Sequence, residues 1–276
     1  MKAHAENNKK SLMWPPPVLP PESPLFERAR IKRASLRALC PLGLSPADEQ
    51  LLAAYNEKDG ETVLSAVAAG ADPNLRMADW GEPLTAHSVE QGCPRVAELL
   101  LHAGASPLED EAALLVALCC KGPASLLKEA LSLCELPSDW RGGVDYMSLA
   151  EYAAACGQVD CLRVLRGCGM DLWADSNRAL CEACRGNHAE VVRYLVEDCG
   201  APLEQEYDDR SPLFYAAEHD ALDCARILLE AGANPLHEDI GGATPFRRAA
   251  SDNMLALLEA EKRKNRWLMP STGRSK

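Results

Sequence analysis

The sequence predicts an all-α solenoid of about six to seven helix-turn-helix repeats joined by short connector hairpins. Two interleaved series of turn residues with a period near 32 residues, short amphipathic segments between them and alanine-rich segments at regular places all support this prediction. Repeats of this length cannot bury their apolar faces alone, so they are stable only when they stack on their neighbours.

The first series marks the turn between the two helices of each repeat. Glycine, aspartate and asparagine tolerate the left-handed backbone that such a turn requires. Successive members are 29 to 35 residues apart, and the second series follows the first by 10 to 14 residues, where the second helix should end. The two series are Gly60, Gly92, Gly122, Gly157, Gly186, Asp220 and Asn253, and Gly70, Gly104, Gly169, Gly200 and Gly232.

The segments between these turns have the pattern of short helices. Residues 95–103 and 224–231 place apolar side chains at spacings of three and four, which form one face of a helix. The first helix of each repeat is rich in alanine, as at residues 152–156 and 215–218, so neighbouring helices can approach closely. Helices of two to three turns are not stable alone, and we expect them to stack.

Several of these segments are similar to the ankyrin repeat. Ser211-Pro-Leu-Phe-Tyr-Ala-Ala217 followed by Leu228-Leu-Glu-Ala-Gly-Ala-Asn-Pro235 carries the resemblance, and Gly242-Ala-Thr-Pro-Phe-Arg-Arg-Ala-Ala250 repeats its opening. The hydroxyl before the proline can cap the helix, and proline suits the first helical turn. The resemblance covers roughly residues 48–265.

The resemblance implies three segments. An ankyrin-repeat domain is expected over residues 45–265, preceded by a flexible Pro-rich and basic leader over residues 1–44 and followed by a basic tail over residues 266–276. The unit at residues 109–136 departs most from the family, because it lacks both the Thr-Pro-Leu opening and the second glycine. Residues 137–146 then insert a longer connector.

Two short motifs lie in the leader. The spacing at Pro17–Pro20 fits the polyproline helix that SH3-type domains bind, and the alternative is a stiff leader without a ligand. Ser35 follows Lys32-Arg-Ala, a pattern typical of phosphorylation by basophilic kinases that also recurs by chance. Residues 25–39 could form a basic amphipathic helix, so organellar import stays open as an alternative.

Charge and hydropathy limit the class of protein. The net charge of −12 divides into +5 for residues 1–37, −22 for residues 38–260 and +5 for residues 261–276. A body this acidic repels phosphate backbones and attracts basic partners, so we expect no nucleic-acid binding by the repeats. The sequence has neither an apolar run that spans a bilayer nor a hydrophobic signal core. We therefore expect a soluble intracellular protein of the cytoplasm or nucleus.

The sequence offers no motif for catalysis. It lacks a Gly-rich phosphate loop, a nucleophile elbow and a His-Glu-x-x-His pair, so we expect neither an enzyme nor a cofactor. The twelve cysteines should be reduced inside a cell. Cys181 and Cys184, with His188, Cys156 and Cys161 nearby, could form a metal site, but close packing explains them more simply and we expect no metal.

The ankyrin resemblance implies that partners bind along a concave surface formed by the connector tips and the ends of the first helices. Three of the five tryptophans fall on connectors beside carboxylates. Rings offer a cation–π face and carboxylates offer charge-assisted hydrogen bonds, which suit an arginine-rich peptide; alternatively, each ring packs on its own connector. The candidate partner-binding residues are Asp79, Trp80, Glu109, Asp110, Trp140, Asp145, Trp173, Tyr207, Asp208, Glu218 and His219.

These observations predict a non-catalytic adaptor or scaffold that binds a basic segment of a partner protein on its acidic concave face. The alternative is a permanent structural or accessory subunit of a larger assembly, anchored through its N-terminal leader. Repeats of this kind bind many unrelated targets, so the fold alone does not name the partner.

Overall fold

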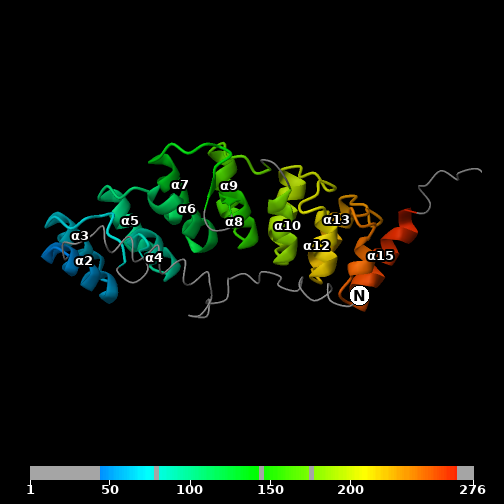
Figure 1. The fold of residues 1–276 in the computed structure, drawn as a ribbon, viewed down its shortest axis with the longest axis horizontal. Helices are drawn as coiled ribbons and strands as arrows, with labels where there is room; N and C mark the ends of the chain where they lie inside the picture. The colour runs from blue at the N-terminus through cyan, green and yellow to red at the C-terminus, as the bar shows by residue number, and fades with distance from the viewer. Residues whose placement is uncertain (1–43, 78–80, 143–145, 174–176, 266–276) are drawn as a thin grey trace, which may run out of the picture.

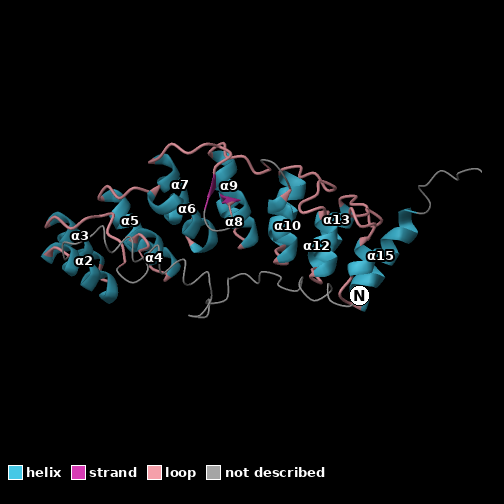
Figure 2. Ribbon diagram, in the orientation of Figure 1, coloured by secondary structure: helices cyan, strands magenta, loops and turns pink. Residues whose placement is uncertain are grey.

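The helices form a single arched row of pairs (Figure 1). The computed structural model describes residues 44–77, 81–142, 146–173 and 177–265. Helix dominates these residues, and the one sheet among them has two strands of two residues each (Figure 2). The predicted all-α solenoid of helix-turn-helix repeats is confirmed, with seven helix pairs in the described part of the chain.

Each pair has an inner helix, which comes first in the chain, and an outer helix, which follows it. In chain order the pairs are α2 (Pro46–Glu57) and α3 (Gly60–Ala68), α4 (Leu84–Glu90) and α5 (Pro94–His102), α6 (Glu109–Lys121) and α7 (Ala124–Ser132), α8 (Leu149–Ala155) and α9 (Val159–Gly167), α10 (Arg178–Arg185) and α11 (Ala189–Arg193), α12 (Pro212–Glu218) and α13 (Leu222–Glu230), and α14 (Pro245–Arg248) and α15 (Asp252–Asn265). A π-helical turn, η1 (Tyr194–Asp198), continues α11.

Proline and serine set the start of several helices. Proline takes a first-turn position in α2, α5, α12 and α14. The expected hydroxyl caps are absent at Ser211 and Thr244, which precede α12 and α14 without a capping hydrogen bond from the side chain. Ser148 does cap α8: its hydroxyl accepts the backbone N–H of Glu151, whose carboxylate accepts the N–H of Ser148.

The second glycine series ends the outer helices, as predicted. Gly70, Gly104, Gly169, Gly200 and Gly232 all have φ between +71° and +101°. This region of backbone conformation is nearly closed to residues with a Cβ atom. The spacing of these glycines therefore reports a real structural requirement of each repeat.

The turns between paired helices are less regular than the first series predicts. Gly92, Gly157 and Asp220 are left-handed as expected. In two other repeats a neighbouring residue takes the left-handed conformation in place of the predicted glycine, and the third and last repeats have no left-handed residue at this turn. The left-handed residue is Lys58 instead of Gly60 in the first repeat and Asn187 instead of Gly186 in the fifth. Gly122 is extended, and Asn253 lies inside α15.

The alanine-rich inner helices pack on one another in chain order. α4 contacts α6, α6 contacts α8, and the row continues through α10 and α12 to α14. Ala86, Ala153, Ala183 and Ala216 are fully buried in this row. Removing apolar surface from water stabilises the stack by about 25 cal/mol per Å², and small side chains allow the close approach.

The third repeat and its connector depart from the pattern, as expected. The first turn of α6 contains left-handed residues at 110–112. The long connector ends in a hairpin in which β1 (Arg141–Gly142) pairs antiparallel with β2 (Met147–Ser148). The ring of Trp140 lies where any side chain at Gly142 would have to go. The hairpin leads directly into α8.

The buried apolar residues divide into two clusters. The smaller cluster lies in α2 to α5 and their connectors, and the larger one extends from α4 to α15. The second repeat contributes to both: Leu84 and Leu100 belong to the smaller cluster, whereas Ala86 and Leu101 belong to the larger. The second repeat is therefore the joint between the two parts of the core.

Replacement of Gly232 by alanine should destabilise the protein by about 1–2 kcal/mol, because φ is +100° there. Gly167, at the end of α9, is the matched control, since an added Cβ meets nothing within 4 Å at either position. Gly167→Ala should leave stability unchanged or raise it by up to about 1 kcal/mol. Urea unfolding midpoints measure the difference, and equal effects of the two substitutions would contradict the assigned role.

Candidate functional site

Carboxylates gather at the connector tips beside the inner helices. Glu109 and Asp110 open α6, and both pair with Arg76 of the preceding connector, at 3.7 and 3.1 Å. Asp208 and Asp209 form the tip before α12, where both are exposed and left-handed. Aspartate is among the few residues that accept this conformation. Two separate repeats therefore present negative charge to solvent.

A further acidic group lies between α4 and α6. The carboxylate of Glu82 is 3.2 Å from Nδ1 of His87. Burial, followed by the nearby charge of Glu90 and a smaller effect of Asp110, raises the pKa of Glu82, and the contact with His87 opposes the rise only in part. Glu90 at the end of α4 and Asp110 at the start of α6 are thus near enough to Glu82 to oppose its ionisation.

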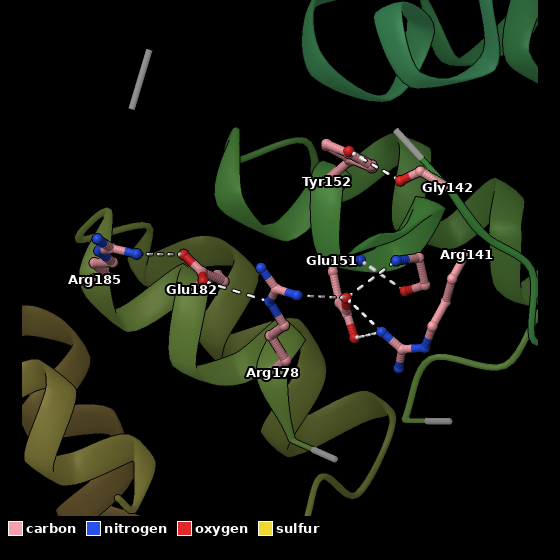
Figure 3. A network of polar contacts seen from close by, with 8 residues as sticks. Arg141, Gly142, Glu151, Tyr152, Arg178, Glu182 and Arg185 are labelled. Atoms are coloured by element: carbon pink, nitrogen blue, oxygen red, sulfur yellow. Dashed lines mark hydrogen bonds and ion pairs between the residues drawn. The ribbon is translucent and has the colours of Figure 1, made fainter. Parts of the chain in front are cut away.

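A network of largely buried polar side chains, called the polar ladder below, connects β1, α8 and α10 (Figure 3). The Glu151 side chain on α8 is 3% exposed, and Nη1 of Arg141 in β1 is 2.9 Å from each of its oxygens. Arg178 on α10 continues the ladder, with Nη1 3.9 Å from Glu151 and Nε 3.7 Å from Glu182. Arg185 then pairs with Glu182 at 3.4 Å. The ladder fixes the hairpin and two inner helices in one arrangement.

The aromatic candidates pack within the chain. The ring of Tyr207 stacks on Tyr215 with centroids 6.2 Å apart, and the guanidinium of Arg178 lies 5.1 Å from the Tyr207 centroid. Trp140 and Trp173 are half-buried against the larger core cluster. Contacts inside the protein thus use much of the ring surface at all three positions.

Glu218 and His219 end the inner helix α12. Arg210 donates to the Glu218 carboxylate at 3.1 Å, and its guanidinium lies 5.6 Å from the Phe214 ring centroid. Burial lowers the pKa of His219, so its imidazole is neutral at neutral pH. This pair therefore presents a partly neutralised carboxylate and an uncharged ring.

Two exposed apolar side chains add to the tips. Tyr146, just before β2, is 69% exposed, and Ile240, in the connector before α14, is 82% exposed. Neither residue is among the final partner-binding candidates chosen from the sequence, although the repeat spacing itself places Ile240 at a connector tip. Both lie at or beside a tip that the repeat spacing locates, and that position is the one signal that could have found them.

The described candidates do not converge on one point. They follow the row of inner helices from α6 to α12, and Arg76 brings Glu109 and Asp110 together. Other predicted sites fall outside the described residues. These are Asp79, Trp80, Asp145, Ser35 and the segment Pro17–Pro20.

The Cys181 and Cys184 thiols lie inside the core. Both are buried, and burial raises the pKa of each. In the part of the chain that the structure describes, His, Cys, Asp and Glu form no group of three or more arranged to hold a metal ion. The described helices are also each too short or too polar to cross a lipid bilayer.

A family model decides the nature of the repeats. Residues 150–239 match the model described as ankyrin repeats, in three copies. The three helix pairs from α8 to α13 are ankyrin repeats. The matched segment runs from α8 through the connector after α13, so it contains the part of the polar ladder on α8 and α10, but not Arg141, and it contains the tip at Asp208. Ankyrin repeats are general protein–protein interaction modules.

Solved ankyrin domains share the fold over most of this chain. The human ASB11 ankyrin repeat domain aligns with a TM-score of 0.66 and 20% identity, covering 79% of this chain and 97% of that domain. The ankyrin repeat domain of Bcl-3 aligns with a TM-score of 0.59 and 22% identity, covering 76% and 97%. These likenesses extend the ankyrin fold beyond the segment that the family model matches.

Curated relatives match over a small part of their length. The potassium channel KOR1 of Oryza sativa subsp. japonica is 37% identical over 86 residues, which are 30% of this chain and 10% of the channel. The BTB/POZ domain-containing protein 3 of Schizosaccharomyces pombe is 36% identical over 80 residues, covering 29% and 15%. The chain thus spans a tenth to a seventh of these relatives.

Removal of Arg141 should destabilise the protein strongly, because it leaves the buried Glu151 carboxylate without its closest cation. We expect Arg141→Ala to cost about 3 kcal/mol or more. Arg226→Ala is the control, since Arg226 pairs with Asp223 on the exposed face of α13, and should cost less than about 1 kcal/mol. Urea unfolding of both variants tests this, and similar losses would show that the ladder carries no special weight.

Glu82 should make stability depend on pH. The pKa of Glu82 is higher in the folded than in the unfolded protein, so the folded state binds the proton more firmly. The protonated Glu82 therefore stabilises the fold below about pH 4.5, and this stabilisation is lost as the pH rises through the pKa of Glu82 in the folded state. The melting temperature of Glu82→Gln relative to the unmodified protein should therefore rise between pH 4 and pH 7. Glu230→Gln, on the exposed side of α13, is the control; a parallel rise there would refute the assignment.

Proposed function

We propose that this ankyrin-repeat protein is a non-catalytic adaptor that holds a basic segment of a partner protein along its acidic inner face. The observation that carries the proposal is the negative charge at tips in separate repeats: Asp208 and Asp209 are exposed, and Glu109 and Asp110 share one guanidinium, that of Arg76. Carboxylates in a row attract an extended cationic segment and set its direction of binding.

The contacts within the chain refine which groups would bind the segment. Arg178 lies over the ring of Tyr207, and Arg210 lies over Phe214 and 6.0 Å from the Tyr215 ring centroid. A partner's arginines would therefore pair mainly with tip carboxylates, whereas Tyr146 and Ile240 offer apolar contact beside them. Charge would supply attraction and register, and the apolar tips would add affinity.

The remaining candidates keep the same role in the proposal. Trp140, Trp173 and the Glu218–His219 pair border the path between the two charged tips, and Asp79, Trp80 and Asp145 would extend it. The SH3-type contact at Pro17–Pro20, phosphorylation of Ser35 and a cytoplasmic or nuclear location stay predictions from the sequence.

The double substitution Asp208→Asn and Asp209→Asn tests the proposal. Asparagine also accepts the left-handed backbone at these positions, so charge is lost while the tip keeps its shape. Affinity for an oligo-arginine peptide, measured by calorimetry at low salt, should fall roughly 2- to 30-fold. The melting temperature should stay unchanged.

The matched control removes two charges from the outer helices. Asp160 and Asp223 are exposed carboxylates on α9 and α13, and Asp160→Asn with Asp223→Asn changes the net charge equally. This control should keep the affinity. If both double variants lose affinity to the same extent, binding follows net charge alone and the inner face has no special role.

A further inference from the structure

The last repeat carries a group of cations at the end of the array. Arg247 and Arg248 lie in the inner helix α14 and Lys262 lies in the outer helix α15, and all three side chains are exposed. Nζ of Lys262 is 5.3 Å from the ring centroid of Phe246, which directly precedes Arg247. The guanidinium of Arg248 is 5.7 Å from the ring centroid of Phe214 on α12. The three cations, called the C-terminal basic patch below, therefore gather around α14.

The charge of this patch is not compensated within the described residues. None of its three side chains pairs with a carboxylate there, and the phenyl rings attract the cations without neutralising them. Other cations of the chain differ in this respect. Arg263 pairs with Glu259 on the same helix at 2.9 Å, and Arg226 pairs with Asp223 on α13 at 3.0 Å. An anionic ligand can therefore supply the charge-assisted hydrogen bonds that the patch lacks.

The sign of the charge changes between two neighbouring inner helices. Asp208 and Asp209 form the exposed acidic tip before α12, and the next inner helix, α14, carries the patch. The two helices are in contact, and packed helices lie about 8–10 Å apart. An extended peptide covers this distance with about three residues of about 3.3 Å each. One partner segment can thus meet negative charge at α12 and positive charge at α14.

The surroundings of the patch favour a short acidic peptide over a polymer of phosphates. Glu238 and Asp239 lie in the connector that leads into α14, and residues 38–260 carry a net charge of −22. A nucleic acid or an anionic membrane extends over a large area, so it would face these carboxylates as well as the patch. A few glutamates or aspartates contact the patch alone.

We propose that the C-terminal basic patch binds a short acidic stretch of the partner protein, about three residues from the basic segment that is held at the tip before α12. Carboxylates of this stretch accept hydrogen bonds from Arg247, Arg248 and Lys262. Opposite charges at the two places give the partner segment one direction along the inner face. This direction rests on the proposed function, whereas the anion-binding site at α14 does not.

Calorimetry at low salt with a hexaglutamate peptide tests the patch itself. Arg247→Gln with Arg248→Gln should lower the affinity for this peptide roughly 2- to 30-fold, and the affinity for an oligo-arginine peptide should not fall. Arg95→Gln with Arg226→Gln is the matched control, since these exposed arginines pair with acids of their own outer helices, and it should keep the affinity. Equal loss in both variants, or no binding of hexaglutamate, would overturn the proposal.

A second variant guards against a change in folding. Arg247→Gln with Lys262→Gln leaves Arg248 on the ring of Phe214, and it should weaken hexaglutamate binding to a similar extent without changing the melting temperature. Unchanged binding in this folded variant would contradict the proposal.

A peptide of six arginines, three glycines and six glutamates tests the direction. It should bind more tightly than the same peptide with glutamines in place of the glutamates, and Arg247→Gln with Arg248→Gln should remove this gain. A gain that survives the substitutions would show that the acidic stretch lies elsewhere. If neither peptide binds while hexaglutamate does, the proposed function is wrong and the anion-binding site stands.

Two results would assign the patch to another occupant and so refute the proposal. The first is tighter binding of an oligo-deoxythymidine of equal charge that is lost in the same variant. The second is a dimer in sedimentation velocity that depends on the patch and excludes hexaglutamate.

Discussion

Each helix pair can bury its apolar face only against the next pair, and this constraint governs the backbone between the repeats as well. The connectors run side by side, and polar side chains of one connector satisfy backbone N–H groups of the next. Asn74 accepts the N–H of Ser106 at 2.7 Å, and Glu204 accepts that of Asn234 at 2.6 Å. Connector geometry and helix stacking therefore depend on each other, because buried or crowded backbone groups need partners.

The polar ladder shows how a stack made largely of alanine can still have one fixed arrangement. Apolar contacts between small side chains permit sliding, whereas the carboxylate of Glu151 is satisfied at a single position of Arg141 and Arg178. Buried ion pairs of this kind fix geometry more than they add stability. The carboxylates at the tips thus stand on a rigid support, which favours binding without rearrangement.

The spacing of turn residues was sufficient to predict the fold, because a left-handed glycine follows five of the seven described outer helices and is a local requirement that the sequence displays directly. The same reasoning could not choose between Gly186 and Asn187, since both tolerate that backbone. The Ser148 to Glu151 capping pattern can be read from the sequence, but the arginines that pair with the Glu151 carboxylate cannot. Arg141 and Arg178 lie 10 and 27 residues away from Glu151, and only the stacking brings them together.

Burial was the other quantity that the sequence could not supply. The carboxylates beside Trp173 and Tyr207 suggested free rings, but each ring packs on its own molecule, and Arg178 occupies part of the cation–π surface of Tyr207. Tyr146 and Ile240 are the most exposed large apolar side chains among the described residues. Their exposure depends on connector shape, which neither composition nor periodicity encodes.

The division of the apolar core at the second repeat gives the array two cooperative units of unequal size. The α2–α3 end can open while the larger cluster stays folded, so loss of structure starts there and halts at the joint. Glu82 and Glu90, whose charges repel, sit at this joint. An added cation there would reduce this repulsion, so a basic segment bound as proposed would oppose fraying of the N-terminal repeats.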